Sequence, residues 1–143
     1  MDVLLNAGII QLRAVLPSQI TSEELGVLDI LRLADKRPSD MTLTLEALRA
    51  DVKSLDSKLR CVFAEKNDIV GWATAESYYF NSKGDVLLLN VFVRSDFRGR
   101  GIGRSLAVEV DKLAHEISSL PPWFNQEHGG FFRHVLPWHF RAA

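Results

Sequence analysis

The segment 91–105, VFVRSDFRGRGIGRS, joins an apolar, strand-like run to an amphipathic helix through a turn rich in glycine and arginine. A turn of this kind leaves the first amides of the helix without acceptors. It directs them, with the positive end of the helix dipole, toward one point. Glycines at 99, 101 and 103 keep side chains away from these amides, and arginines at 98, 100 and 104 add positive charge. The segment therefore predicts a phosphate-binding site between a strand and a helix.

The spacing excludes two common phosphate-binding loops. A Walker loop ends in Gly-Lys followed by Ser or Thr, whereas this segment has Gly103-Arg104-Ser105. The dinucleotide-binding fingerprint needs a third glycine at position 104 or 106, and these positions hold Arg104 and Leu106. What remains is the pattern Arg-x-x-Gly-x-Gly over residues 98–103, where the helix begins.

Apolar residues elsewhere change their spacing several times, which predicts a mixed fold of strands and helices. The expected elements are strands at 10–14, 60–65, 69–80 and 86–93, and helices from the capping box Thr21–Glu24, at 45–55 and at 102–117. We expect an α/β (α+β) fold class, in which helices flank a mixed, mostly antiparallel central sheet. Residues 1–143 would form a single domain with its core in 9–117 and an atypical aromatic tail in 118–143.

Two of these elements carry expectations about burial. The run Val86–Leu89 is apolar at every position, which predicts a central strand covered on both faces. In the helix at 102–117, an apolar stripe lies opposite the polar positions, which are Glu109, Asp111, Lys112 and Glu116.

Composition limits the classes of function. The chain has 143 residues, of which 47% are apolar, and a net charge of −1, which argues against binding nucleic acid or a membrane through the overall field. No apolar run approaches the ~20 residues of a membrane span, and the N-terminus lacks the basic region of a signal peptide. The single cysteine, Cys61, lies in an apolar run and is expected to be a buried, inert thiol. These features together predict a cytoplasmic protein.

The strand order and the pattern at 98–103 resemble the GNAT superfamily of acyl-CoA-dependent acyltransferases. Its pyrophosphate motif is Arg/Gln-x-x-Gly-x-Gly/Ala after a strand, and the likeness covers roughly residues 9–117. The resemblance implies acetyl transfer from acetyl-CoA to a primary amine of a small molecule or a protein. It further implies that the cofactor binds the strand end and the turn, namely Val91, Phe92, Val93, Arg98, Gly99, Arg100, Gly101, Ile102, Gly103, Arg104 and Ser105.

The resemblance also implies an acid or ordered water that helps deprotonate the attacking amine. Glu76 is the nearest candidate base, and the alternative is an ordinary solvated strand acid. Asn90 is a candidate for orienting a water or the amine, or else it satisfies a backbone group at a strand kink.

The tail, residues 118–143, departs from the family pattern because it contains no tyrosine to act as the general acid. Its run Phe131–Leu136 is expected to form a short fifth strand, which would bring His128 or His134 near the thioester as an acid or base. The alternative is that these histidines lie at the rim of an aromatic plug. Tyr78 and Tyr79 are adjacent strand residues, so one is expected in the core and the other on the surface.

The sequence leaves several alternatives for the function open. One is a catalytically weak acetyl-CoA-binding module that acts as a sensor or regulatory partner, and another is contact between the arginine turn and RNA phosphates. The histidines lack the close pairing of zinc sites, so no metal is expected. An uncovered sheet edge would favour a homodimer.

Overall fold

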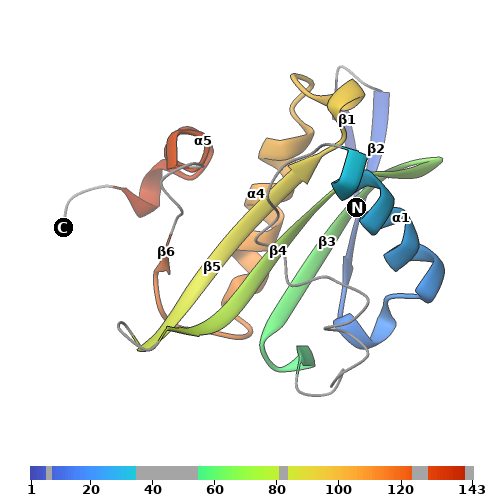
Figure 1. Ribbon diagram of the computed structural model, residues 1–143. Helices are drawn as coiled ribbons and strands as arrows, with labels where there is room; N and C mark the ends of the chain where they lie inside the picture. Colours follow the sequence, from blue (N-terminus) through green and yellow to red (C-terminus); the bar gives the residue numbers. More distant parts are fainter. Residues whose placement is uncertain (6–7, 35–54, 81–83, 124–128, 141–143) are drawn as a thin grey trace.

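The computed structural model describes residues 1–5, 8–34, 55–80, 84–123 and 129–140 (Figure 1). The strands are β1 (Asp2–Leu5), β2 (Gly8–Val15), β3 (Leu59–Lys66), β4 (Asp68–Phe80), β5 (Gly84–Val93) and β6 (Pro122–Trp123). The α-helices are α1 (Ser22–Ala34), α4 (Ile102–Ala114) and α5 (Gly129–Val135), and the 3-10 helices are η1 (Pro17–Gln19), η2 (Ser95–Phe97) and η4 (Pro137–His139). The helix predicted at 45–55 lies outside the described residues, apart from its last residue, Leu55, which is helical.

The six strands form one sheet in sequence order, β1-β2-β3-β4-β5-β6. Each pair from β1 to β5 is antiparallel, and β6 runs parallel to β5, which it pairs only at Leu87 and Leu88. The hairpin between β3 and β4 turns at Asn67, whose φ of 64° is the left-handed conformation that asparagine tolerates well. The predicted mixed, mostly antiparallel sheet is therefore confirmed, and β1 and β6 are additions to it.

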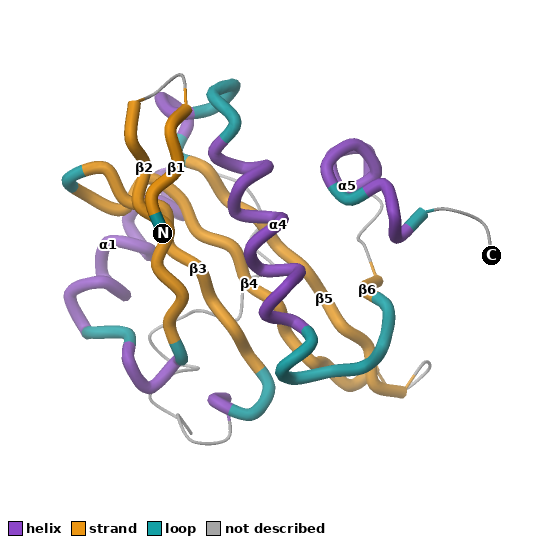
Figure 2. Tube along the Cα trace, turned by 180° about the vertical axis from the view of Figure 1, so that it is seen from behind, coloured by secondary structure: helices purple, strands orange, loops and turns teal. Residues whose placement is uncertain are grey.

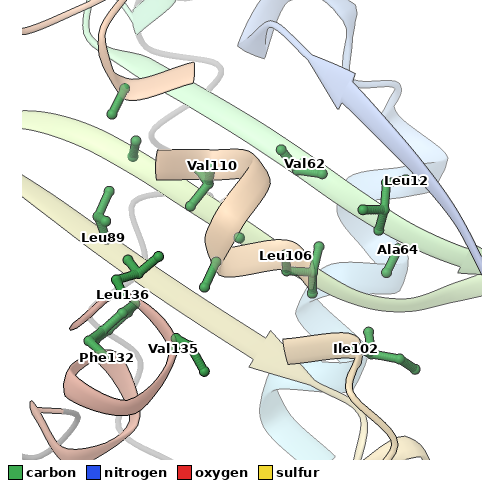
Figure 3. Close-up of a cluster of buried hydrophobic side chains, with 14 of the residues drawn as sticks. Leu12, Val62, Ala64, Leu89, Ile102, Leu106, Val110, Phe132, Val135 and Leu136 are labelled. Carbon is green, nitrogen blue, oxygen red and sulfur yellow. The ribbon is translucent and has the colours of Figure 1, made fainter. Parts of the chain in front are cut away.

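Helices cover both faces of the sheet (Figures 1 and 2). On one face, α1 packs Leu25 and Leu28 against a cluster that includes Phe63 and Trp72. On the other face, α4 packs against the second cluster, to which α5 adds Phe132, Val135 and Leu136 (Figure 3). Side chains alternate along β4 and β5, so the two faces are supplied by alternate residues of each strand.

Local signals in the sequence account for two details. The capping box at the start of α1 is present, because Thr21 Oγ1 accepts from the amide of Glu24 at 3.1 Å and Glu24 Oε1 accepts from the amide of Thr21 at 2.9 Å. Cys61 is buried as predicted, and burial raises the pKa of its thiol, which keeps it protonated and unreactive.

Two predictions about β5 and the tail are wrong. Strand β5 is the second strand from the edge and not central, and its two faces are covered unequally: Leu87 and Leu89 on the α4 face are fully buried, whereas Leu88 and Phe92 on the other face are only partly buried. The run Phe131–Leu136 lies mostly in helix α5 and contains no strand. Its buried residues Phe132, Val135 and Leu136 have the i, i+3, i+4 spacing of one helix face.

Asp111 is a third correction. It was expected on the polar side of its helix, yet it is only 7% exposed in α4. The reason is that the C-terminal segment packs over this side of α4, which a helix considered alone does not reveal. Within the described parts of the chain, no helix is long and apolar enough to cross a membrane.

Candidate functional site

The junction between β5 and α4 has a backbone shape that glycine makes possible. Gly99 and Gly101 have φ values of 75° and 87°, and Gly101 is the N-cap of α4. The first hydrogen bond of the helix runs from the amide of Ser105 to the carbonyl of Gly101 at 3.2 Å. The amides of residues 102–104 precede it, so they have no acceptor within the helix and are directed out of its N-terminus.

Three arginines belong to the turn and to the first turn of α4. Arg98 Nε donates to the carbonyl oxygen of Val93 at 2.8 Å, which ties the turn to the end of β5. The guanidinium of Arg100 lies 5.3 Å from the ring centre of Phe97, within the range of a cation–π contact. Arg104 is exposed on the first turn of α4. The turn therefore adds positive charge to an end of the helix that already favours anions.

A pocket of about 530 Å³ opens at this junction. Its lining comes from the end of β5, the turn, the start of α4, and α5, namely Val91, Val93, Phe97, Arg98, Gly99, Gly101, Ile102, Gly103, Arg104, Phe131, Phe132, His134 and Val135. Most of the residues predicted to hold the cofactor are thus brought together around one cavity. Three of them, Phe92, Arg100 and Ser105, do not line it.

Phe92 points to the opposite face of the sheet. Its ring stacks on Trp72 with the ring centres 4.3 Å apart, and both belong to the cluster under α1. The alternation along β5 explains this, because Val91 and Val93 face the pocket and the residue between them faces away. The side chain of Phe92 therefore supports the strand, and only its backbone is at the edge.

Helix α5 supplies a wall of the pocket that the sequence analysis did not assign. Phe131, Phe132 and Val135 line the cavity, and their aromatic and apolar side chains face the start of α4. A Cβ at Gly103 would lie 3.4 Å from Phe131 Cζ and 3.5 Å from Val93 Cγ2, so the absence of a side chain there lets the wall approach the helix closely. The i, i+3, i+4 spacing of Phe132, Val135 and Leu136 could have indicated a helix here, but not that it packs beside the turn.

The three candidate catalytic residues fall into two groups. His134 is exposed on α5 and lines the pocket. Glu76 and Asn90 lie on the other face, because alternation places them with Trp72 and Phe92. Asn90 is opposite Thr74 in the register and thus diagonal to Glu76, a relation that spans about 7–8 Å between Cα atoms.

Glu76 is 7% exposed, so the alternative of a solvated strand acid is wrong. It is paired in the register with Leu59 of β3 and Leu88 of β5, inside the sheet and away from its edges. Burial of a carboxylate is costly unless it is compensated, which makes this position unusual for a strand acid.

The structure describes the other candidates named from the sequence only in part. The side chains of Tyr78 and Tyr79 and the whole of His128 lie outside what the structure describes. Phe132 is 1% exposed, but Phe131 and Trp138 are 38% and 47% exposed, so the aromatic tail is buried only in part. In the described residues, no three His, Cys, Asp or Glu side chains are grouped as metal ligands would be.

Known proteins share this architecture. The Acetyltransferase (GNAT) family model matches residues 27–126, which is well over half of the chain. A predicted acetyltransferase from Clostridium acetobutylicum, solved with acetyl-CoA, aligns with a TM-score of 0.63 and 17% identity over 94% of this chain and 90% of that one.

Two further similar structures are acetyltransferases named for different acceptors. Glucosamine-6-phosphate N-acetyltransferase from Arabidopsis thaliana has a TM-score of 0.59 and 14% identity, covering 88% of this chain and 89% of that one. Ribosomal-protein-alanine N-acetyltransferase from Brucella melitensis has a TM-score of 0.55 and 16% identity, covering 94% and 92%. No curated protein sequence matches the chain. At these identities the structural likeness concerns the fold, and with the family match it leads to one conclusion: the chain belongs to the GNAT acetyltransferase family.

Proposed function

We propose that the chain is an N-acetyltransferase that moves the acetyl group of acetyl-CoA to a primary amine of a small molecule or a protein. The observation that carries this proposal is the pocket at the start of α4, where free helix amides, the arginines at 98 and 104 and the end of β5 meet. A diphosphate is the chemistry that such a helix terminus accommodates best. The similar structure from C. acetobutylicum, which holds acetyl-CoA, supports the same cosubstrate.

In this proposal the pyrophosphate binds the amides and arginines of the turn, Arg98, Gly99, Arg100, Gly101, Ile102, Gly103, Arg104 and Ser105. The pantetheine arm binds the backbone of Val91, Phe92 and Val93. Strand β6 pairs with β5 only at Leu87 and Leu88, so within the described residues the edge of β5 beyond them has no neighbouring strand. Its backbone groups are therefore available to an extended ligand.

The proposed reaction is direct attack by the amine nitrogen on the thioester carbonyl. The new C–N bond forms, the C–S bond breaks, and a backbone amide of β5 stabilises the developing oxyanion, which contributes roughly 3 kcal/mol when such a donor is preorganised. Glu76, directly or through water, takes the proton from the amine, and Asn90 orients the amine on the same face. His134 protonates the CoA thiolate from the pocket side.

One observation favours a second function, acetyl-CoA binding without efficient catalysis. Neither Glu76 nor Asn90 lines the pocket, since their strand positions place them on the face that packs against α1. The acetyl group has to reach that face at the edge of β5 for these residues to act on the amine. A sensor or regulatory module would need only the pocket.

Titration of acetyl-CoA in a calorimeter tests the cofactor site. We expect binding that Arg98→Ala and Arg104→Ala each weaken, because both remove charge from the pocket. Arg94→Ala is the matched control, since it removes a nearby arginine that pairs with Asp96 at 2.6 Å and does not line the cavity. A folded wild type that binds no acetyl-CoA contradicts the proposal.

Release of free CoA thiol in the presence of a panel of amines and N-terminal peptides then separates the two functions. Glu76→Gln should lower the rate of CoA release while leaving the affinity for acetyl-CoA unchanged. His134→Gln should change the pH dependence of that rate. Glu116→Gln is the control, because this exposed acid pairs with Arg60 at 2.9 Å on the surface. Binding without release from any amine would favour the sensor.

We also propose that the chain forms a homodimer, since an edge strand such as β1 offers unpaired backbone groups to a second copy. Leu4 and Ile9, paired across β1 and β2, are exposed apolar residues at this edge. Equilibrium sedimentation should show a dimer at high micromolar concentration, and a monomer alone would contradict it.

A further inference from the structure

The C-terminal segment, formed by α5 and η4, is both a wall of the pocket and a separate layer packed on α4. It contributes Phe131, Phe132, His134 and Val135 to the cavity. Figure 3 shows Phe132, Val135 and Leu136 lying together over β5, on the same side of the sheet as α4. The shape of the pocket therefore depends on where this segment is held.

Helix α5 has only 7 residues and does not hold its position by itself. Isolated helices shorter than about 12–15 residues are marginal in water, so its structure depends on tertiary contacts. Arg133 lies over the ring of Phe140 at 4.7 Å, which ties α5 to the residues after η4. The segment is thus one packed unit whose position is set by its contacts with the rest of the domain.

A buried carboxylate on α4 makes two polar contacts with this segment. Trp138 Nε1 donates to Asp111 Oδ2 at 3.3 Å, and His139 Nε2 lies 2.7 Å from Asp111 Oδ1. The side chains of Asp111 and His139 are 10% and 17% exposed. Because a buried carboxylate is costly without partners, these contacts fix the segment at one place on the helix.

The segment is held to α4 at two separated points. Phe131 lies against Gly103 near the N-terminus, and Asp111 is eight residues further along, a distance of about 12 Å at the helical rise. The same helix therefore carries the anion-binding amides at one end and the anchor of the opposing wall further along. A shift at the anchor alters the gap between α5 and the turn.

We propose that Asp111 is a positioning residue for the acetyl-CoA pocket, which it shapes by holding Trp138 and His139 and thereby the wall that α5 supplies. This inference rests on the proposed function, because it concerns the same pocket. Asp111 does not line the cavity, so its effect on the cofactor passes through the C-terminal segment.

Calorimetric titration of acetyl-CoA tests the proposal through two separate readouts, affinity and stoichiometry. Asp111→Asn keeps the size of the side chain and removes its charge, and it should weaken affinity by about tenfold while the stoichiometry stays at the wild-type value. Trp138→Phe removes one of the two contacts from a ring that is 47% exposed, and it should weaken affinity less. The double variant should weaken affinity by less than the sum of the two single effects, because both changes act on the same attachment of the C-terminal segment to α4.

Glu109→Gln is the matched control. It removes a carboxylate two positions away on the same helix, one that pairs with Lys112 at 3.3 Å, and it should leave the affinity for acetyl-CoA unchanged. If Asp111→Asn does not fold, Trp138→Phe alone decides the question.

The outcomes are distinguishable. A lower stoichiometry with unchanged affinity would mean that Asp111 serves stability only, and the proposal would be overturned. Wild-type affinity and stoichiometry in both variants would overturn it too, while leaving the proposed function intact. A folded wild type that fails to bind acetyl-CoA would overturn the proposed function and this inference together.

Discussion

Gly71 in β4 is a position where one methyl group should reveal how closely β4 and β5 pack. A Cβ built there would lie 2.7 Å from the carbonyl oxygen of Phe92, 3.2 Å from Leu106 Cδ1 and 3.4 Å from Val93 Cα. The nearest of these atoms belongs to the backbone of the neighbouring strand, so it cannot rotate away. Strand β5 has to shift to accept the methyl group.

The cost of Gly71→Ala follows from this overlap. Inserting a group into a close-packed region costs about 1–3 kcal/mol, which is a large part of the stability of a domain of this size. The free energy of unfolding of a domain of this size falls by about 2 kcal/mol for each molar of urea, so the urea midpoint of unfolding should fall by about 1 M. Because Val91 and Val93 line the pocket, the same shift should weaken binding of acetyl-CoA.

Gly26→Ala is the matched substitution, and it should change stability in the opposite direction. Gly26 lies inside α1, and a Cβ there would meet nothing within 4 Å. Gly26→Ala should therefore stabilise the chain by about 0.8–1 kcal/mol through helix propensity. Urea unfolding of both variants, followed by circular dichroism, measures the difference directly. A midpoint for Gly71→Ala at or above the wild-type value would refute the close approach of the two strands.

Three further predictions concern α1 and α5. Thr21→Ala removes the hydrogen bond to the amide of Glu24 and should cost about 1 kcal/mol in urea unfolding, whereas an unchanged midpoint would contradict the capping box. Burial by itself would raise the pKa of Glu24, but hydrogen bonds from Thr21 and Arg13 outweigh it and lower that pKa. A lowered pKa in the folded state stabilises the chain above the ordinary pKa of 4.5, so stability should fall as the pH drops through the folded value; Glu24→Gln should flatten that slope. Phe132→Ala empties a buried site and should cost about 3–5 kcal/mol; a loss below 1 kcal/mol would indicate that α5 does not pack as described.

Much of the fold could be predicted from the sequence, because the signals for its caps, turns and longer elements are local. The capping box at Thr21 and the left-handed turn glycines Gly99 and Gly101 depend on neighbouring residues only. The strands β2 to β5 and helix α4 are long enough for their apolar periods to be recognised. Short elements were missed or assigned wrongly: β1 and β6 have 4 and 2 residues, and a strand was predicted at Phe131–Leu136, most of which lies in the 7-residue helix α5.

The proposed pyrophosphate-binding turn could be predicted because its chemistry is carried by consecutive residues. A glycine-rich turn at the start of a helix favours an anion, since the amides and the dipole belong to that helix. The cofactor pocket around the turn needs side chains from segments far apart in the sequence. Its second wall, with Phe131 and Val135, is close to the turn only after α5 packs on α4.

Tertiary packing alone sets the environments of two of the charged residues, Asp111 and Glu76. Asp111 has the helical position of a solvent-facing acid, and it is buried because Trp138 and His139 cover it. Glu76 has the neighbours of an ordinary strand acid, and strand register places it inside the sheet, diagonal to Asn90. Periodicity shows which residues share a face of one element, but the partner of that face depends on long-range contacts that no local pattern encodes. The proposed anion-binding turn therefore depends on fifteen consecutive residues, 91–105, whereas the cavity beside it forms only in the folded chain.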